Sequence, residues 1–348
     1  MKTLTLLVGL LILGTTMAEA SRFRRKADTL TVVSYNIENF FDPADDPNKN
    51  DNEFTPDGPY NWTMSRMSIK ASRVARVISS INGWNIPDIV GLCEIEGPDA
   101  VELLLQKGRL RRYYSAVAFP TPDRRGIATA MLYRKDRVKV LHSQAICTSD
   151  STRNFFTRDI LYAKTAVSRD TFHIFVNHWP SKRGGSSRSD ALRDTVAYQL
   201  RLFTDSLQAV EPDANIIILG DFNDVATSKS ITDVLGVSAD TLAVADTSGV
   251  KPFCNLSGLT DECSYKYRGS WRTIDHIIVS RTMTQRYECR FDVFKPSYLL
   301  QDEPSPYTGE KPFRTYLGQK YNDGYSDHLP VIAKIVMKRS NKQTKENR

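Results

Sequence analysis

The chain has 348 residues, of which 41% are hydrophobic and 25% are charged. These fractions are ordinary for a folded soluble protein and exclude a chain that is disordered throughout, and the length suits one large domain or two average ones. The formal net charge of +7 favours polyanionic partners such as nucleic acid or anionic lipid, although many basic proteins bind neither.

Residues 1–20 have the three parts of a secretory signal peptide. Lys2 supplies a short positive region, residues 4–13 are apolar, and Ala18-Glu19-Ala20 is a small-x-small cleavage site. The apolar run is too short to span a bilayer, and no other stretch has the pattern of a transmembrane segment. We therefore expect a secreted or periplasmic protein.

The remainder of the chain has no internal repeat and no linker that would divide it. We expect a basic lead-in at residues 21–28, one domain at 29–338, and a disordered polar tail at 339–348. We expect the protein to be a monomer.

Five cysteines in an exported chain leave at least one without a disulfide partner. Cys254 and Cys263 are close in sequence and are the best candidates for a disulfide. Cys93 lies in an apolar run and is predicted to be a buried thiol.

Hydrophobic periodicity predicts the helices and strands. In chain order, we expect a strand at 29–37, a loop at 42–60, a helix at 64–81, a strand at 89–94, a short helix at 101–106, an antiparallel meander of strands at 114–119, 127–133, 138–146, 160–167 and 172–176, a polar loop at 177–185, a helix at 187–208, and strands at 216–219, 273–279 and 332–337. Residues 224–270 and 298–312 show no clear pattern.

The most informative stretch follows the apolar segment 216–219. Gly220-Asp221-Phe222-Asn223-Asp224 ends a buried strand and delivers two carboxylates and an amide. Glycine, aspartate and asparagine also favour ordinary turns, so this stretch alone leaves both interpretations open. Asp275 is more specific, because it interrupts an apolar strand, where an unpaired carboxylate is costly. Histidine is an obvious partner for it.

Polar groups recur at the ends of the other predicted strands. Carboxylates and amides with few cysteines suit a hard cation such as Mg²⁺, Mn²⁺ or Ca²⁺ rather than structural zinc. Together with two histidines, such a set is suited to the attack of water on a phosphate ester. The strand-end groups are Asn36, Glu38, Glu94, His178, Asp221, Asn223, Asp275, Asp327 and His328.

Six short motifs in order resemble the endonuclease/exonuclease/phosphatase superfamily, which includes DNase I, abasic-site endonucleases, sphingomyelinases and inositol-polyphosphate 5-phosphatases. Each motif is weak alone, but the set spans about residues 29–338. The motifs are Ser34-Tyr35-Asn36-Ile37-Glu38-Asn39, Leu92-Cys93-Glu94-Ile95-Glu96, Val176-Asn177-His178-Trp179-Pro180-Ser181, Gly220-Asp221-Phe222-Asn223-Asp224, Ile274-Asp275-His276 and Ser326-Asp327-His328-Leu329-Pro330.

The resemblance implies an α/β fold, a four-layer αββα sandwich of two packed mixed β-sheets, with the site at one end. It implies Mg²⁺ (or Mn²⁺ or Ca²⁺) held chiefly by Glu94, with Asn36 and Glu38 assisting and Asp327 as a further ligand. These four are its implied metal ligands.

The resemblance also implies roles for the remaining site residues. His328 would be held by Asp275 and contact the scissile phosphate, while Asp221 would activate water or assist the leaving group. Asn223 and Arg158 would bind the phosphate. His178 stands where the DNase I and sphingomyelinase branches have histidine.

The resemblance leaves the substrate open. We expect a metal-dependent phosphodiesterase acting on nucleic acid, with a phosphomonoesterase or lipid phosphodiesterase of the sphingomyelinase or inositol-phosphatase kind as the alternative. The signature of the 5-phosphatases is absent, since Trp271-Arg272-Thr273-Ile274-Asp275-His276 stands in its place. A binding module on a degraded scaffold is disfavoured, because every core position holds a competent residue.

Overall fold

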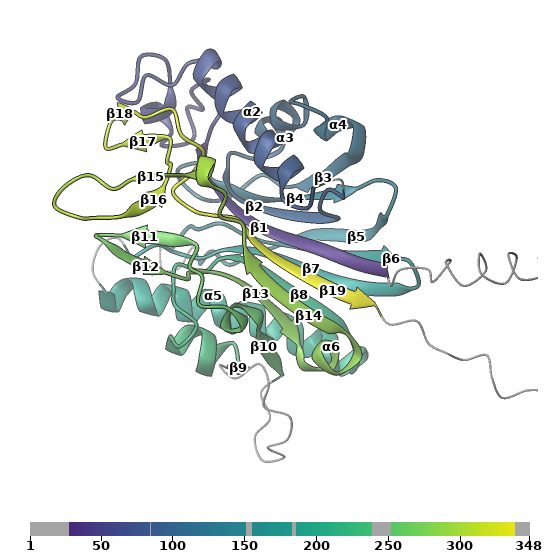
Figure 1. Ribbon diagram of the computed structural model, residues 1–348. Coiled ribbons are helices and arrows are strands. Elements are labelled where there is room, and N and C mark those ends of the chain that lie inside the picture. The colour runs from purple at the N-terminus through teal and green to yellow at the C-terminus, as the bar shows by residue number, and fades with distance from the viewer. Residues whose placement is uncertain (1–27, 84, 151–154, 183–185, 239–251, 338–348) are drawn as a thin grey trace, which may run out of the picture.

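The computed structural model describes residues 28–83, 85–150, 155–182, 186–238 and 252–337. The predicted signal peptide, all but the last residue of the basic lead-in and the predicted C-terminal tail lie outside these residues. The described chain forms two mixed β-sheets that pack face to face, with helices on the outer side of each (Figure 1). The expected αββα sandwich is confirmed.

The first sheet has six strands in the order β14-β19-β1-β2-β4-β3. β1 pairs in parallel with β2 and antiparallel with β19, so the two ends of the domain lie side by side. The strands are β1 (Asp28–Phe40), β2 (Ile89–Ile95), β3 (Tyr114–Ala118), β4 (Ala128–Arg134), β14 (Glu288–Val293) and β19 (Val331–Met337).

The second sheet has seven strands in the order β5-β6-β7-β8-β13-β10-β9. β8 pairs in parallel with β7 and antiparallel with β13. The strands are β5 (Val138–Ile146), β6 (Ile160–Val167), β7 (Asp170–His178), β8 (Asn215–Asp221), β9 (Val237–Ser238), β10 (Phe253–Asn255) and β13 (Asp275–Ser280).

Helices cover the outer face of each sheet (Figure 1). The first sheet is covered by α2 (Met64–Ser80), α3 (Pro98–Leu105) and α4 (Leu110–Tyr113), and the second by α5 (Ser186–Val210) and α6 (Arg281–Arg286). α2 begins after Thr63, whose hydroxyl accepts a hydrogen bond from the Arg66 amide and caps the helix. Among the described residues, no helix combines the length and apolarity needed to cross a membrane.

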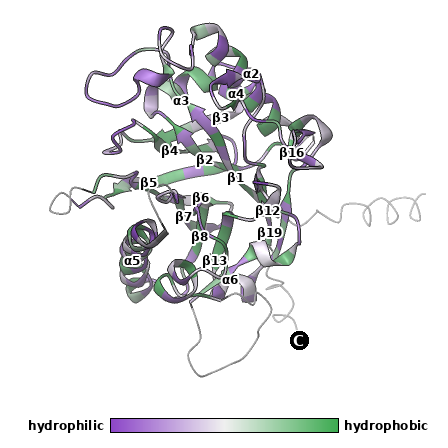
Figure 2. Ribbon diagram, turned by 90° about the vertical axis from the view of Figure 1, so that its left-hand side faces the viewer, coloured by the Kyte–Doolittle hydropathy of each residue, from purple (hydrophilic) through white to green (hydrophobic). Residues whose placement is uncertain are grey.

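β8 shows why the sheets stack as they do. Its side chains alternate, so that Ile217 and Leu219 enter the core between the sheets while Ile216 and Ile218 enter the core beneath α5. All four are fully buried, at about 1.5–3 kcal/mol of favourable transfer free energy each. A strand buried on both faces needs a continuous apolar run, and Figure 2 shows hydrophobic colour along the inner strands.

The predicted meander of five strands is divided between the two sheets, so that prediction was wrong. β3 and β4 pair in the first sheet, whereas β5, β6 and β7 form an antiparallel meander in the second. The chain changes sheet at the short turn between β4 and β5. Hydrophobic alternation identifies each strand but not its partner, because both sheets bury one face in the same core.

The segments without a clear pattern contain short elements. They are η3 (Ser230–Val234), η4 (Leu256–Leu259), β11 (Tyr265–Tyr267), β12 (Ser270–Arg272), η5 (Ser297–Leu299), β15 (Leu300–Asp302) and β16 (Glu310–Pro312), followed by β17 (Tyr316–Leu317) and β18 (Lys320–Tyr321), while η1 (Asn52–Phe54) lies in the loop after β1. The hairpins β11–β12, β15–β16 and β17–β18 project at one end of the sandwich (Figure 1).

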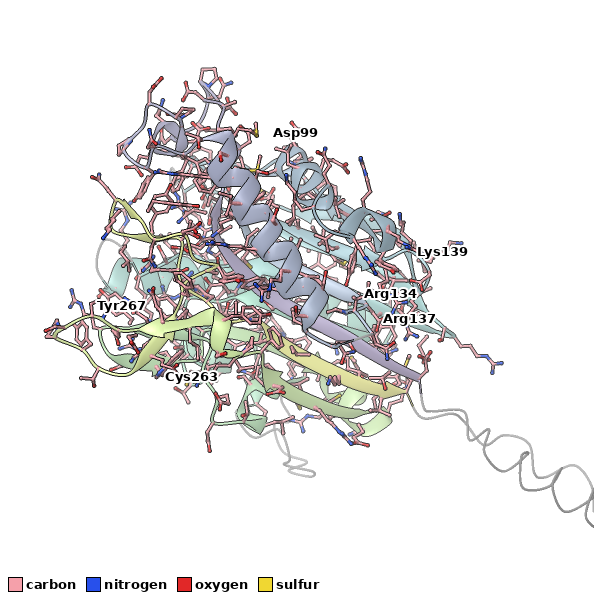
Figure 3. The ribbon with its side chains drawn as sticks, turned by 45° about the horizontal axis from the view of Figure 1, so that its top comes forward. Asp99, Arg134, Arg137, Lys139, Cys263 and Tyr267 are labelled. Atoms are coloured by element: carbon pink, nitrogen blue, oxygen red, sulfur yellow. The ribbon has the colours of Figure 1, made fainter. Side chains whose placement is uncertain are left out.

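The predicted Cys254–Cys263 disulfide is absent. Cys254 lies in β10 and is buried in the core between the sheets, whereas Cys263, labelled in Figure 3, lies in the loop before β11. The Cys263 thiol faces the carbonyl oxygen of Asp261 at 3.7 Å. Closeness in sequence was misleading, because the strand draws one cysteine into the core. Cys93 is a buried thiol, as predicted.

Candidate active site

Strand register builds one row of polar groups across the second sheet. His178, Asp221 and Asp275 are paired neighbours at the ends of β7, β8 and β13. All three are buried, with exposed fractions of 4% or less. The groups that were predicted separately at strand ends therefore meet at one edge of this sheet.

Gly220 makes this close approach feasible. Its φ of +144° lies in a region that side chains rarely adopt, and a Cβ added there would lie 1.9 Å from the carbonyl oxygen of Asn177 on β7. The glycine thus lets β8 pass against β7 one residue before Asp221.

Asn36 joins the two sheets. It lies on β1, and its Nδ2 donates to Oε1 of Glu94 at 3.2 Å and to Oδ2 of Asp221 at 3.0 Å. Glu94, near the end of β2, has a φ of +62° and accepts a second hydrogen bond from the Asn39 amide at 2.8 Å. One amide thus fixes two carboxylates from opposite sheets.

Asp221 lies between two histidines. Its Oδ2 is 3.8 Å from Nε2 of His178 and 3.8 Å from Nε2 of His328, while its Oδ1 accepts from the Asn223 amide at 2.8 Å. Burial raises the pKa of Asp221 to about 7; His328 opposes this rise and Asp275 adds to it.

The two histidines differ in charge. Burial lowers the pKa of His178 well below its ordinary value, and Arg158 and Arg125 add to the effect. Burial also lowers the pKa of His328, but the carboxylates of Asp275 and Asp221 outweigh it and raise that pKa well above the ordinary value. At neutral pH the site therefore presents one neutral and one protonated imidazole to the same carboxylate.

The expected contact between His328 and Asp275 is present. Nδ1 of His328 lies 2.8 Å from Oδ2 of Asp275, which also accepts from the Ser264 hydroxyl at 2.6 Å. The ring of Tyr265 packs on the imidazole with centroids 4.7 Å apart. His276 points to the opposite side of β13, where its Nε2 contacts the carbonyl oxygen of Asp224.

The two residues predicted to bind phosphate share one anchor. Arg158 Nη2 and Asn223 Nδ2 donate to the carbonyl oxygen of Trp179 at 2.8 and 3.0 Å. Arg158 also lies 3.4 Å from Asp123 and is 8% exposed. Its Nε, buried and without a partner within the described residues, leaves a donor for a ligand.

Glu38 and Asp327 are paired with basic side chains. Glu38 Oε2 accepts from the Thr315 amide at 2.6 Å, and its carboxylate also pairs with Lys70 and Arg314. Asp327 pairs with Arg314 at 3.1 Å, and this contact holds its pKa below the usual value despite burial. Metal ligation by either residue stays a prediction.

Sequence reasoning missed Arg314, Lys70 and Tyr265. Arg314 bridges Glu38 and Asp327, and its side chain is 37% exposed, so part of the guanidinium faces solvent beside the site. Nothing in the sequence indicated Arg314 as a site residue, because the segment before it shows no hydrophobic periodicity. Lys70 lies within the predicted helix at 64–81 and was given no role, yet it is 1% exposed and contacts Thr315 and Tyr325.

The donor set fits the hard cation that was predicted. Ligand atoms of Glu94, His178 and Asp221 all lie within 4.8 Å of one another. Because His178 is neutral, this group brings two carboxylates together without a positive charge among its own members. The second such group, formed by Asp221, Asp275 and His328, already contains a protonated histidine, so the first group is the better place for a cation.

Solved structures with the same fold are only distantly similar in sequence. An endonuclease/exonuclease/phosphatase family protein from Bacteroides thetaiotaomicron is 14% identical, with coverage of 92% of this chain and 99% of that one and a TM-score of 0.56. D. rerio TDP2 complexed with single strand DNA product is 18% identical, with coverage of 88% and 99% and a TM-score of 0.52. SmcL is 15% identical, with coverage of 88% and 99% and a TM-score of 0.57.

No curated protein sequence matches the chain. The sequence model of the Endonuclease/Exonuclease/phosphatase family, however, matches residues 31–338. Apart from the first three residues of β1, this range contains both sheets and every group of the site described above. The chain therefore belongs to the endonuclease/exonuclease/phosphatase family, whose members are metal-dependent enzymes that hydrolyse phosphate esters.

Proposed function

We propose that the chain is an exported, divalent-metal-dependent phosphodiesterase that hydrolyses nucleic acid. The observation that carries this proposal is the placement of Asp221 between a neutral His178 and a protonated His328. Neighbouring groups whose pKa values are driven apart are typical of acid–base chemistry. The net charge of +7 and the DNA product bound by the TDP2 structure favour a polyanionic substrate.

Each side chain of the site has a role in the proposed hydrolysis. Protonated His328 donates a hydrogen bond to a non-bridging phosphate oxygen, and Asp275 keeps the ring oriented. Asp221, with a pKa of about 7, accepts the proton of the attacking water near neutral pH. Arg158 and Asn223, fixed on the Trp179 carbonyl oxygen, hold the phosphate.

The cation is held chiefly by Glu94, which Asn36 and the Asn39 amide orient. When bound, it supplies positive charge against the phosphate oxygens. Mg²⁺ is our choice of ion, with Mn²⁺ and Ca²⁺ as substitutes, because the donors are oxygens and one imidazole.

A substrate panel tests the proposal. Purified protein is incubated with duplex DNA, single-stranded DNA, RNA, sphingomyelin and inositol phosphates, each with Mg²⁺, Mn²⁺ or Ca²⁺. We expect cleavage of an oligonucleotide that stops with EDTA and with Glu94→Gln but persists with Asp99→Asn, an exposed acid on the neighbouring helix (Figure 3). Hydrolysis of sphingomyelin or a phosphomonoester without cleavage of nucleic acid would contradict the proposed substrate. Full activity in EDTA would contradict the proposed dependence on a metal.

Export has its own test. The protein is expressed in a host with a secretion pathway, and the first residues of the product outside the cytoplasm are sequenced. We expect the product to begin at Ser21, directly after the Ala18-Glu19-Ala20 site. A product that stays in the cytoplasm and keeps Lys2 would contradict export.

A further inference from the structure

The loop at residues 41–60, between β1 and α2, carries acidic groups that the proposed chemistry does not use. Its backbone folds onto the end of β2, since the Asp42 amide donates to Oε2 of Glu96 at 2.6 Å. Within the loop, the Asp46 amide donates to Oδ2 of Asp51 at 3.1 Å. The loop that carries Asp42 and Asp51 therefore lies against Glu96, which follows β2.

Asp51 is the unusual member of this cluster. It is 2% exposed, and within the described residues its Oδ1 has no hydrogen-bond partner. Besides the Asp46 amide that Oδ2 accepts, its carboxyl group has that of Glu96 within hydrogen-bond reach. An ionised carboxylate oxygen that is buried without a partner is costly, and a second carboxylate beside it increases the cost.

No basic side chain offsets these acids in the part of the chain that the structure describes, where Asp42, Asp51 and Glu96 form no salt bridge. Lys49 is a neighbouring basic residue, because its stem and Glu96 both lie 3.7 Å from the Cβ position of Gly126. Its Nζ, however, donates to the carbonyl oxygens of Thr121 at 2.6 Å and Asp123 at 3.1 Å.

We propose that Asp51 and Glu96 are ligands of a second cation site, selective for Ca²⁺ and separate from the catalytic one. Asp42 adds a third negative charge beside them. Peptide carbonyls of the irregular loop and water complete the coordination. Ca²⁺ takes six to eight oxygens in flexible geometry, as a loop can supply, whereas Mg²⁺ demands a regular octahedron.

The site fastens the loop to the strand that carries Glu94. Glu96 is two residues beyond Glu94, whose φ of +62° is an uncommon conformation for a residue with a side chain. Asp42 follows the end of β1, which carries Asn36. A cation there holds the ends of β1 and β2 together and keeps Glu94 in place without contacting the substrate.

Calcium binding is measured by titration calorimetry with CaCl₂ alone, in a Glu94→Gln background that removes the chief catalytic ligand. We expect one remaining Ca²⁺ site and a rise in Tm of a few degrees with Ca²⁺. Asp51→Asn and Glu96→Gln should each weaken this binding at least tenfold. The matched control is Asp57→Asn, which removes an exposed acid from the same loop and should leave binding unchanged.

Terbium luminescence provides a reading that needs no ligand variant. Trp62 Nε1 donates to the carbonyl oxygen of Phe41, next to Asp42, so the indole is placed to sensitise Tb³⁺ in the site. We expect Trp-sensitised emission that Ca²⁺ displaces and Mg²⁺ does not. No Ca²⁺ uptake by Glu94→Gln protein, equal loss in Asp57→Asn, or binding of Mg²⁺ alone would overturn the proposal. Each of these results is independent of whether nucleic acid is the substrate.

Discussion

Nδ1 of His328 lies 2.8 Å from Oδ2 of Asp275, and this contact connects the two sheets of the sandwich. Asp275 begins β13 of the second sheet, while His328 precedes β19 of the first. The same carboxylate oxygen accepts from Ser264, so Asp275 is held from two sides. The orientation of the imidazole therefore depends on how the sheets pack.

His328→Ala should lower kcat by roughly 10²–10⁴-fold, the range for a positioned acid–base or electrostatic group. Asp275→Asn should lower it as well, because the ring loses the carboxylate that raises its pKa. The two residues act as a unit, so the double variant should be little worse than His328→Ala alone. The four kcat/KM values are measured on the substrate that the panel identifies. If the two single losses multiply in the double variant, the residues do not act as a pair.

His173 gives a pH dependence far from the site. It is 1% exposed, with Nδ1 2.9 Å from the Tyr162 hydroxyl and Nε2 3.1 Å from Glu211. Burial outweighs Glu211 and lowers the pKa of His173. Above pH of about 6.5 both the folded and unfolded states are neutral here. Below it the unfolded state takes up the proton first, and stability is lost.

Between pH 7.5 and pH 5.5, the Tm of wild-type protein should therefore fall by more than that of His173→Gln, which lacks the buried imidazole. His142→Gln is the matched control, because His142 lies exposed on β5. Its Tm should follow that of wild type at both pH values. A larger acid loss in His173→Gln than in wild type would contradict the direction of the pKa shift.

Gly220→Ala should destabilise the fold by at least about 3 kcal/mol or prevent folding, since both the φ and the contact with Asn177 exclude a side chain. Gly83→Ala is the matched control, because Gly83 also has a positive φ, of +61°, but nothing lies within 4 Å of its Cβ position. It should cost only about 1–2 kcal/mol. Urea denaturation measures both free energies of unfolding. Equal losses would show that the approach of β8 to β7 is not the constraint.

The sequence predicted the strand ends of the site well, for a physical reason. A buried strand is a continuous apolar run, so Asp221 stood out as a polar group at the end of one and Asp275 as an interruption of another. The sequence could not give the pairing of strands, because both sheets share one core and alternation looks the same in each. The meander was misassigned on this account.

Contacts between distant segments were equally hidden. The family resemblance implied Glu38 as an assisting metal ligand but not its other partner, the amide of Thr315, which lies 277 residues later and donates to its carboxylate. No local sequence pattern predicts a contact with so distant a residue. Cys254 illustrates the same limit, because its burial depends on the strand that follows the loop rather than on its distance from Cys263.

Arg314 is the residue for which structure adds most to sequence. It connects Glu38 at 3.2 Å with Asp327 at 3.1 Å, and its side chain is 37% exposed beside the site. A guanidinium has five donors in a planar fork, so these two contacts leave others for a substrate phosphate. We expect Arg314 to bind that phosphate in the ground state and in the transition state.

Arg314→Met keeps the stem and removes the charge. Since a charge-assisted hydrogen bond contributes about 1.5–3 kcal/mol, kcat/KM should fall by roughly 10–150-fold, mainly through a higher KM. Arg290→Met is the matched control, because Arg290 pairs with Glu288 on the exposed face of β14, in the part of the sheet remote from the site. Its kinetics should equal those of wild type. Tm is measured for both variants, and Glu38 retains Lys70 and the Thr315 amide when Arg314 is removed. An unchanged KM with a folded Arg314→Met protein would show that Arg314 only spaces Glu38 from Asp327.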